Sequence, residues 1–190
     1  MTSAFETRTA ALLQQDMFRW RCLQLARQLN LPDWYLGAGF LRNAIWDHLH
    51  QLPMTPLNDI DLVYFDATEL SCQREQQAEA WLQQQLPGYR FEVRNQARMH
   101  LLHGHAPYQN CADGISRWVE IPTCVGVHLG ANDRLSFTCA FGLAANWSLQ
   151  VAMNPHHPRP AIFTERIKQK NWLQLWPQLQ ISWPAPTASS

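Results

Sequence analysis

Apolar residues in the first half of the chain recur with either a helical or a strand period. Helical spacing predicts helices over residues 9–29, 40–49 and 70–86. Short apolar runs and period-two alternation predict strands over residues 34–37, 59–65 and 89–95. Apart from its two acids, the run at 59–65 is almost wholly apolar, which is typical of a strand that lies deep in a sheet.

The second half of the chain has a weaker periodicity. Helical segments are expected over residues 97–105, 115–119 and 160–175, and extended segments over residues 123–129 and 135–141, whereas residues 149–153 fit neither period. The order of these elements predicts an α+β fold with a central mixed sheet flanked by helices. We expect one domain over residues 1–183, in which the part from about residue 106 forms a small subdomain, and a disordered tail over residues 184–190.

Charge is balanced along the 190 residues, with 15 Lys and Arg against 15 Asp and Glu. No overall field therefore attracts nucleic acid or membranes. The five cysteines are widely spaced, without a C-x-x-C pair, as expected for reduced thiols. No apolar stretch approaches the roughly 20 residues that span a bilayer, and the N-terminus does not resemble a signal peptide. We expect a cytoplasmic protein without a membrane partner.

A glycine turn follows the first expected strand. Gly37 and Gly39 form this turn, and Arg42 lies one turn into the helix that follows. Backbone N–H groups at such a turn bind phosphate oxygens, and an arginine there can bind a triphosphate with two nitrogens. The G-x-G lacks the third glycine of a dinucleotide fingerprint. The plain alternative is a tight turn without a ligand, with Arg42 in a surface ion pair.

Two carboxylates, Asp59 and Asp61, alternate on the expected strand over residues 59–65. Side chains two residues apart share a face of a strand and lie roughly 7 Å apart along the backbone. Two such carboxylates can bind a pair of divalent cations, Mg²⁺ or alternatively Mn²⁺, and a metal pair assists the displacement of pyrophosphate from a nucleotide. Alternating acids also occur on solvated strand faces, but on a central strand unpaired carboxylates are costly to bury.

Glu92 is the third candidate carboxylate, because it lies on the next expected strand and faces away from its apolar neighbours. Two-metal transfer generally uses three acids. The polar run that follows includes Arg94, Asn95 and Arg98, whose side chains could contact a base or a phosphate. The alternatives are a solvated Glu92 beside Arg94 and an ordinary helix cap at Asn95. A hydrolase that works through cysteine or a histidine-bound metal is the weakest alternative, because the spacing of those residues matches no such site.

The glycine turn and the two acids resemble the head region of polymerase-β-type nucleotidyltransferases, which include CCA-adding enzymes and poly(A) polymerases. A longer resemblance, over roughly residues 10–175, is to a bacterial family of nucleotidyltransferase-like proteins with unassigned substrates. The E-V-[KR]-N-Q-A-R-M-H run of that family matches residues 92–100. Its W-P-E-T-A-T-A-V-G run is similar to residues 118–126.

This resemblance implies a polymerase-β-like domain that transfers NMP from an NTP to an acceptor hydroxyl by a two-metal mechanism. It implies that Asp59, Asp61 and Glu92 are the catalytic acids and metal ligands. It implies that Gly37, Gly39 and Arg42 form the phosphate side of the pocket and that Arg94, Asn95 and Arg98 contact nucleotide or acceptor. Without a long basic extension, a small-molecule or protein acceptor is favoured over nucleic acid.

Two segments depart from the family pattern. Where the family has G-L-x-D-L-F, residues 142–147 are G-L-A-A-N-W and lack the acid. In the second segment, the R-P-N-P of the family becomes A-M-N-P at residues 152–155. The first difference motivates the alternative function, a catalytically silent module with the same fold that binds a nucleotide or a protein partner.

Overall fold

The structure, a computed structural model, describes residues 3–184. Its helices are α1 (Ala4–Gln15), α2 (Met17–Gln28), α3 (Gly39–Leu49), α4 (Gln73–Gln85), α5 (Met99–His103), α6 (Cys111–Ser116), α7 (Leu143–Trp147), α8 (Pro160–Lys170) and α9 (Trp172–Leu175), with 3-10 turns η1 (Gln96–Arg98) and η2 (Ile121–Thr123). Its strands are β1 (Tyr35–Gly37), β2 (Ile60–Tyr64), β3 (Phe91–Asn95), β4 (Val125–Leu129), β5 (Leu135–Cys139), β6 (Gln150–Ala152) and β7 (Gln180–Ser182). All but the first residue of the expected disordered tail lie outside the described residues.

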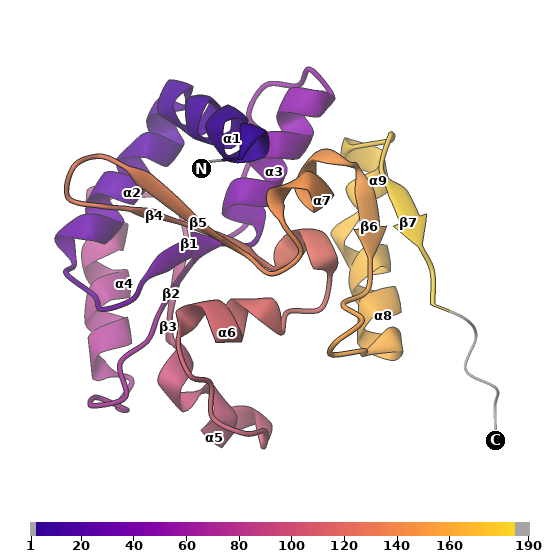
Figure 1. The fold of residues 1–190 in the computed structure, drawn as a ribbon. Helices are drawn as coiled ribbons and strands as arrows, with labels where there is room; N and C mark the ends of the chain where they lie inside the picture. The colour runs from indigo at the N-terminus through magenta and orange to yellow at the C-terminus, as the bar shows by residue number, and fades with distance from the viewer. Residues whose placement is uncertain (1–2, 185–190) are drawn as a thin grey trace.

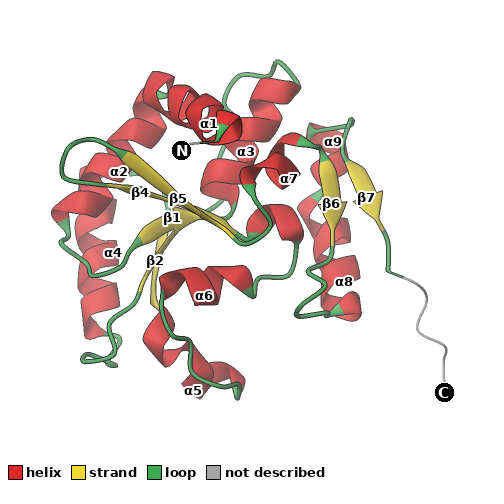
Figure 2. Cartoon of the chain, in the orientation of Figure 1, coloured by secondary structure: helices red, strands yellow, loops and turns green. Residues whose placement is uncertain are grey.

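The central sheet has five strands in the order β3-β2-β1-β4-β5. Strands β2 and β3 are parallel, whereas β1 is antiparallel to both β2 and β4. Figures 1 and 2 show this sheet with helices on both sides and the small β6–β7 pair next to α8. The predicted α+β fold with a mixed sheet flanked by helices is therefore confirmed.

One face of the sheet is closed by a hydrophobic core. Apolar residues of β2 and β3, such as Leu62 and Val93, pack there with side chains of α2, α3 and α4, among them Leu23, Leu41 and Leu82. Because side chains alternate along a strand, the polar residues between them point to the other face. The sequence of β2, in which apolar residues flank an acid, therefore places that acid opposite the main helical layer.

The other face is covered only in part. Helix α6 packs on it through Cys111 and Ile115, which form a small cluster with Val63 of β2. The C-terminal segment, with α8, α9 and β6–β7, has its own apolar cluster, into which Trp46 of α3 inserts. Figure 1 shows α9 near the end of α3, where Trp46 contacts Trp172, and the C-terminal segment lies beside the exposed part of this face.

The structure departs from the predicted elements in several places, and the helix expected over residues 115–119 lies earlier in the chain, as α6 (Cys111–Ser116). The helix expected over residues 9–29 is two helices, because Asp16 has an extended backbone and its side chain accepts a hydrogen bond from the N–H of Arg19. Strand β7 falls beyond the last expected element, and α7 lies where no element was expected. Both are short, and tertiary packing rather than a local period stabilises such elements.

All five cysteines are free thiols, and Cys22, Cys111 and Cys124 are buried. Among the helices of residues 3–184, none is long and apolar enough to cross a membrane.

Candidate active site

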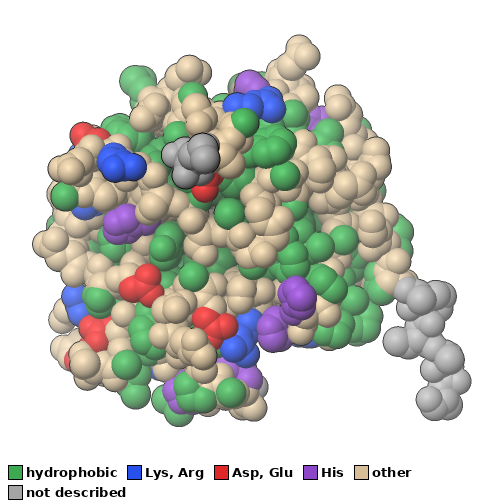
Figure 3. All heavy atoms as spheres, in the orientation of Figure 1, with side chains coloured by type: hydrophobic (Ala, Val, Ile, Leu, Met, Phe, Trp, Pro, Cys, Tyr) green, Lys and Arg blue, Asp and Glu red, His purple; other side chains and the backbone are tan. Residues whose placement is uncertain are grey.

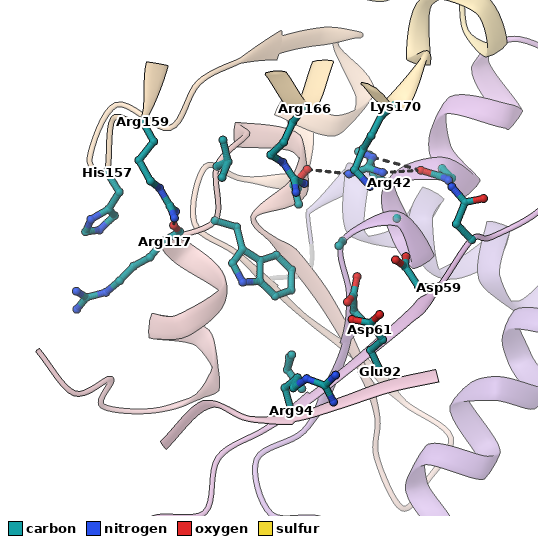
Figure 4. Close-up of a pocket in the computed structure, with 18 of the residues that line it drawn as sticks. Arg42, Asp59, Asp61, Glu92, Arg94, Arg117, His157, Arg159, Arg166 and Lys170 are labelled. Carbon is teal, nitrogen blue, oxygen red and sulfur yellow. Dashed lines mark hydrogen bonds between the residues drawn. The ribbon is translucent and has the colours of Figure 1, made fainter. Parts of the chain in front are cut away.

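A pocket of about 950 Å³ opens on the partly covered face of the sheet, between the strands and the C-terminal segment. Figure 4 shows that side chains from β2, β3, α3 and α8 converge on it. The predicted residues that line it are Gly39, Arg42, Asp59, Asp61, Glu92 and Arg94. The fold thus brings together residues that are up to 55 positions apart in the sequence, from Gly39 to Arg94.

The three acids are placed by the backbone of the sheet. Asp61 and Glu92 are register partners on the parallel strands β2 and β3, so their side chains lie on the same face as neighbours. Asp59 directly precedes β2, and in Figure 4 its carboxylate faces the same cavity. Glu92 also forms an ion pair with Arg90, with a distance of 2.5 Å between Oε1 and Nη2.

Negative charge accumulates at Asp61. Burial, with the nearby carboxylates of Asp59 and Glu92, raises the pKa of Asp61 to about 6, and the positive charge of Arg42 opposes this rise only in part. A bound cation would stabilise this group of carboxylates in their charged form.

The chemistry of the donor set fits a hard divalent cation such as Mg²⁺, which prefers carboxylate oxygens. Within residues 3–184, no group of three or more His, Cys, Asp or Glu side chains is already arranged as a metal cluster. Asp59, Asp61 and Glu92 are the residues that would hold the ion, and Arg90 shares the carboxylate of Glu92.

The turn between β1 and α3 brings the backbone to the edge of the pocket. Ala38 has a positive φ of 51° and begins the helix without a side-chain cap. Gly39 follows it and lines the pocket. At Gly37 a Cβ atom would lie 2.7 Å from the ring of Trp118, so a glycine is required there by packing. Gly37 is not among the residues that line the pocket.

Arg42 is held rigidly beneath the turn. Its side chain is buried, and Nη1 donates a hydrogen bond of 2.7 Å to Oγ1 of Thr123 while Nε and Nη2 donate to Oδ1 of Asn43. The guanidinium lies over the rings of Trp172 and Trp46, 4.4 and 5.0 Å from their centroids. Burial lowers the pKa of Arg42 to about 10, so the group remains charged at neutral pH.

Two other predicted nucleotide contacts lie outside the pocket lining. Asn95 is buried and fixes the loop after β2, since its Nδ2 donates hydrogen bonds to the carbonyl oxygens of Asp66 and Glu69. Arg98 forms a two-bond ion pair with Glu75 of α4. Arg94 does line the pocket, although its Nη1 is 2.6 Å from Oε1 of Glu79.

The structure adds cations that the sequence did not single out. Arg166 and Lys170, one turn apart on α8, line the pocket opposite the acids (Figure 4). Arg166 also donates to both carboxylate oxygens of Glu120, which is fully buried. The i, i+4 spacing of the two cations, beside the apolar Phe163 and Ile167, was the available signal that one helix face is basic.

The buried cysteines have the character of core residues. Burial raises the pKa of Cys124 to about 12, and its thiol donates to the carbonyl oxygens of Trp118 and Glu120. Burial also raises the pKa of Cys111. Because the thiolate is the nucleophilic form, these two residues do not fit the role of a catalytic thiol.

The sheet order, with acids on paired strands below a glycine turn, is found in a fold similar to that of a nucleotidyltransferase head domain. The chain belongs to the nucleotidyltransferase family, because the sequence model of that family matches residues 24–181. The resemblance noted in the sequence is thereby confirmed. No curated protein matches the chain.

Solved structures agree with this fold. An NMR structure described as revealing a CCA-adding enzyme head domain is similar over 97% of this chain and 98% of its own, with a TM-score of 0.82 and 27% identity. A structure described as a tRNA-processing enzyme complex matches 84% of this chain with a TM-score of 0.50 and 14% identity, which shows likeness of fold alone. This chain corresponds to 42% of the length of that second protein.

Proposed function

We propose that this protein transfers NMP from an NTP to the hydroxyl of an acceptor. The observation that carries the proposal is the register of β2 and β3, which sets Asp61 beside Glu92 on a face that also receives Asp59. Acids on one side of the pocket and cations on the other match the two demands of the reaction, activation of a hydroxyl and binding of a triphosphate.

The basic side of the pocket would bind the phosphates. The first N–H groups of α3 have no partner within their own helix and can donate to phosphate oxygens at the turn near Gly39. Arg42, Arg166 and Lys170 surround this region with positive charge. The reaction then forms a bond between the acceptor oxygen and the α-phosphorus, breaks the bond from the α-phosphorus to the bridging oxygen, and releases pyrophosphate and the hydroxyl proton.

Asp59, Asp61 and Glu92 would hold Mg²⁺, or Mn²⁺ in its place. The metal would supply charge neutralisation on the phosphates and lower the pKa of the acceptor hydroxyl. The acids orient the acceptor side of the pocket, and Arg94 lies beside them on β3 as a further contact for nucleotide or acceptor. No covalent nucleophile is required, in agreement with the raised pKa values of the buried thiols of Cys111 and Cys124.

The departure at residues 142–147 lies in α7, none of whose residues lines the pocket. Asn146 donates a hydrogen bond to the carbonyl oxygen of Pro122, so the segment supports η2. This placement favours an enzyme over the silent module, since the acid that is lost would not have faced the three carboxylates.

Calorimetric titration of the four NTPs, with and without Mg²⁺, tests the proposal. Wild type should bind at least one NTP in a Mg²⁺-dependent manner, Asp61→Asn should lose the metal dependence, and Glu165→Gln, an exposed acid on α8, should bind like wild type. Absence of binding by folded wild type would contradict the proposal. Binding without pyrophosphate release across varied acceptors would favour the silent module.

A further inference from the structure

A second group of basic side chains lines the pocket away from the acids. Arg117 follows α6, while His157 and Arg159 belong to the loop between β6 and α8. Figure 4 shows these three side chains together at one end of the pocket and Asp61 at the other. Figure 3 shows histidine and basic side chains gathered at the surface over the same loop. The proposed triphosphate contacts do not use this end.

The charge of this group is only partly balanced. Arg117 pairs with Asp113, with 2.9 Å between Nε and Oδ1. Arg159 forms no ion pair within the described chain, and its Nη2 donates to the carbonyl oxygen of Arg117. Burial, together with the positive charges of Arg117 and Arg159, lowers the pKa of His157. This end of the pocket is therefore electropositive and would be stabilised by an anion.

The loop that carries His157 and Arg159 is fixed to the segment that carries Arg117. Asn154 is fully buried, and its Nδ2 donates hydrogen bonds of 2.8 and 2.9 Å to the carbonyl oxygens of Ser116 and Trp118. The N–H of His156 donates in turn to Oδ1 of Asn154. Prolines at positions 158 and 160 restrict the backbone on both sides of Arg159. The basic side chains thus project from a rigid support, which reduces the entropic cost of binding a ligand.

The pocket is large enough for two substrates. Its volume of about 950 Å³ lies near the top of the range of about 300–1,000 Å³ typical of small-molecule sites. A nucleotide whose phosphates lie at Arg42 and Lys170 would leave the opposite end free for the acceptor.

We propose that Arg117, His157 and Arg159 bind the phosphate group of a small phosphorylated acceptor, whose hydroxyl then reaches the acids. The inference rests on the proposed nucleotidyl transfer and names the class of its acceptor. Two guanidinium groups and an imidazole offer donors to the three oxygens of a phosphomonoester. The group lies within a pocket of a chain with balanced charge, which favours a small acceptor over a nucleic acid.

Histidine-ring NMR of the full chain, titrated with inorganic phosphate and with ribose 5-phosphate, tests the inference. The ring signals of His157, assigned with His157→Gln, should shift saturably with both probes. Arg159→Gln should weaken this response about ten-fold, in line with the loss of one charge-assisted hydrogen bond. Arg159 is exposed, so the variant should fold. Lys168→Gln removes an equal charge on α8 outside the pocket and should respond like wild type.

Several outcomes would overturn the inference. An absent His157 response, or one unchanged in both Arg159→Gln and Arg117→Gln, would exclude the phosphate site. Tighter competition at His157 by a single-stranded RNA pentanucleotide than by ribose 5-phosphate would exclude the small acceptor. NTP titration of the same samples separates the two proposals. If the protein binds NTP but the His157 signals do not shift with the phosphate probes, only the acceptor site is excluded. If the His157 signals shift but no NTP binds, nucleotidyl transfer is excluded, and so is the role of this site in binding the acceptor.

Discussion

The pocket has an acidic wall, formed by Asp59, Asp61 and Glu92, and a basic wall, formed by Arg166 and Lys170. The two walls are held in place in different ways. Asp61 and Glu92 are neighbours because parallel strands pair them in a fixed register, so backbone hydrogen bonds determine their positions. Arg166 and Lys170 belong to α8, and side-chain packing determines the position of this wall. We infer that the acids can be changed without harm to the fold, whereas the basic wall depends on apolar packing and also on the ion pair of Arg166 with the buried Glu120.

Helix α3 joins the two walls. Trp46 packs at 5.2 and 5.1 Å, between ring centroids, against Trp172 and Trp176 of the C-terminal segment. The indole N–H of Trp176 donates a 2.9 Å hydrogen bond to the buried carboxylate of Asp47. Arg42, from the same helix, lies between Trp46 and Trp172 and lines the pocket. Helix α3 therefore contributes to holding the C-terminal segment in place, together with the ion pair between Arg166 and Glu120.

The largest expected effect is on turnover, from Asp61→Asn. Loss of one preorganised charged group should lower kcat by roughly 100- to 1,000-fold. Because burial and like charges raise the pKa of Asp61, its ionised form costs stability at neutral pH, and the neutral amide should leave Tm unchanged or higher. Pyrophosphate release and thermal unfolding measure the two effects. Full turnover in this variant would contradict the assignment of the acidic wall.

The next effect is on stability, from Arg166→Gln. This change leaves the fully buried carboxylate of Glu120 without its partner, and the free energy of unfolding should fall by about 2 kcal/mol. Urea denaturation measures it. The double variant Glu120→Gln with Arg166→Gln should recover most of the loss, because no charge then remains buried. A stability equal to that of wild type in the single variant would show that packing alone holds the basic wall.

A smaller effect is expected on nucleotide affinity from Lys170→Gln. Burial and the positive charges of Arg166 and Arg42 lower the pKa of Lys170, which shows how closely the cations gather at this wall. Removal of one charge-assisted contact to a triphosphate should weaken NTP binding about ten-fold, with little change in kcat. Calorimetry measures it, with Lys168→Gln on the same helix as the control. Equal affinities in the two variants would place the triphosphate elsewhere.

The sequence predicted the acidic wall better than the basic one because the acids follow a local period. Polar and apolar residues alternate along β2 and β3, and in the structure Asp61 and Glu92 lie on one face of the sheet while their apolar neighbours lie in the core on the other. The same rule would have excluded Asn95 from that face, since it shares the parity of Phe91 and Val93, which lie in the core. Asn95 is accordingly buried and holds a loop.

The basic wall could not be predicted in the same way. Arg166 and Lys170 face the pocket only because tryptophans 46, 172 and 176 bring α8 and α9 against α3, and no local pattern specifies that contact. The break at Asp16 was missed because apolar spacing continues across it, while its side chain caps α2. Hydrophobic periodicity and short motifs therefore do not predict the position of a residue that depends on partners far away in the sequence.

The smallest expected effect on NTP binding is from Arg98→Gln. This variant tests whether Arg98 binds the nucleotide or only stabilises the fold. Arg98 lies outside the pocket and pairs with the buried Glu75, which also accepts a 2.7 Å hydrogen bond from the N–H of Asn95. NTP affinity should stay within about two-fold of wild type, while the free energy of unfolding should fall by about 1–2 kcal/mol, since Glu75 keeps one of its donors. Parallel calorimetry and urea denaturation measure the two quantities. A ten-fold loss of affinity at unchanged stability would instead assign Arg98 to the nucleotide site and extend the basic wall beyond the C-terminal segment.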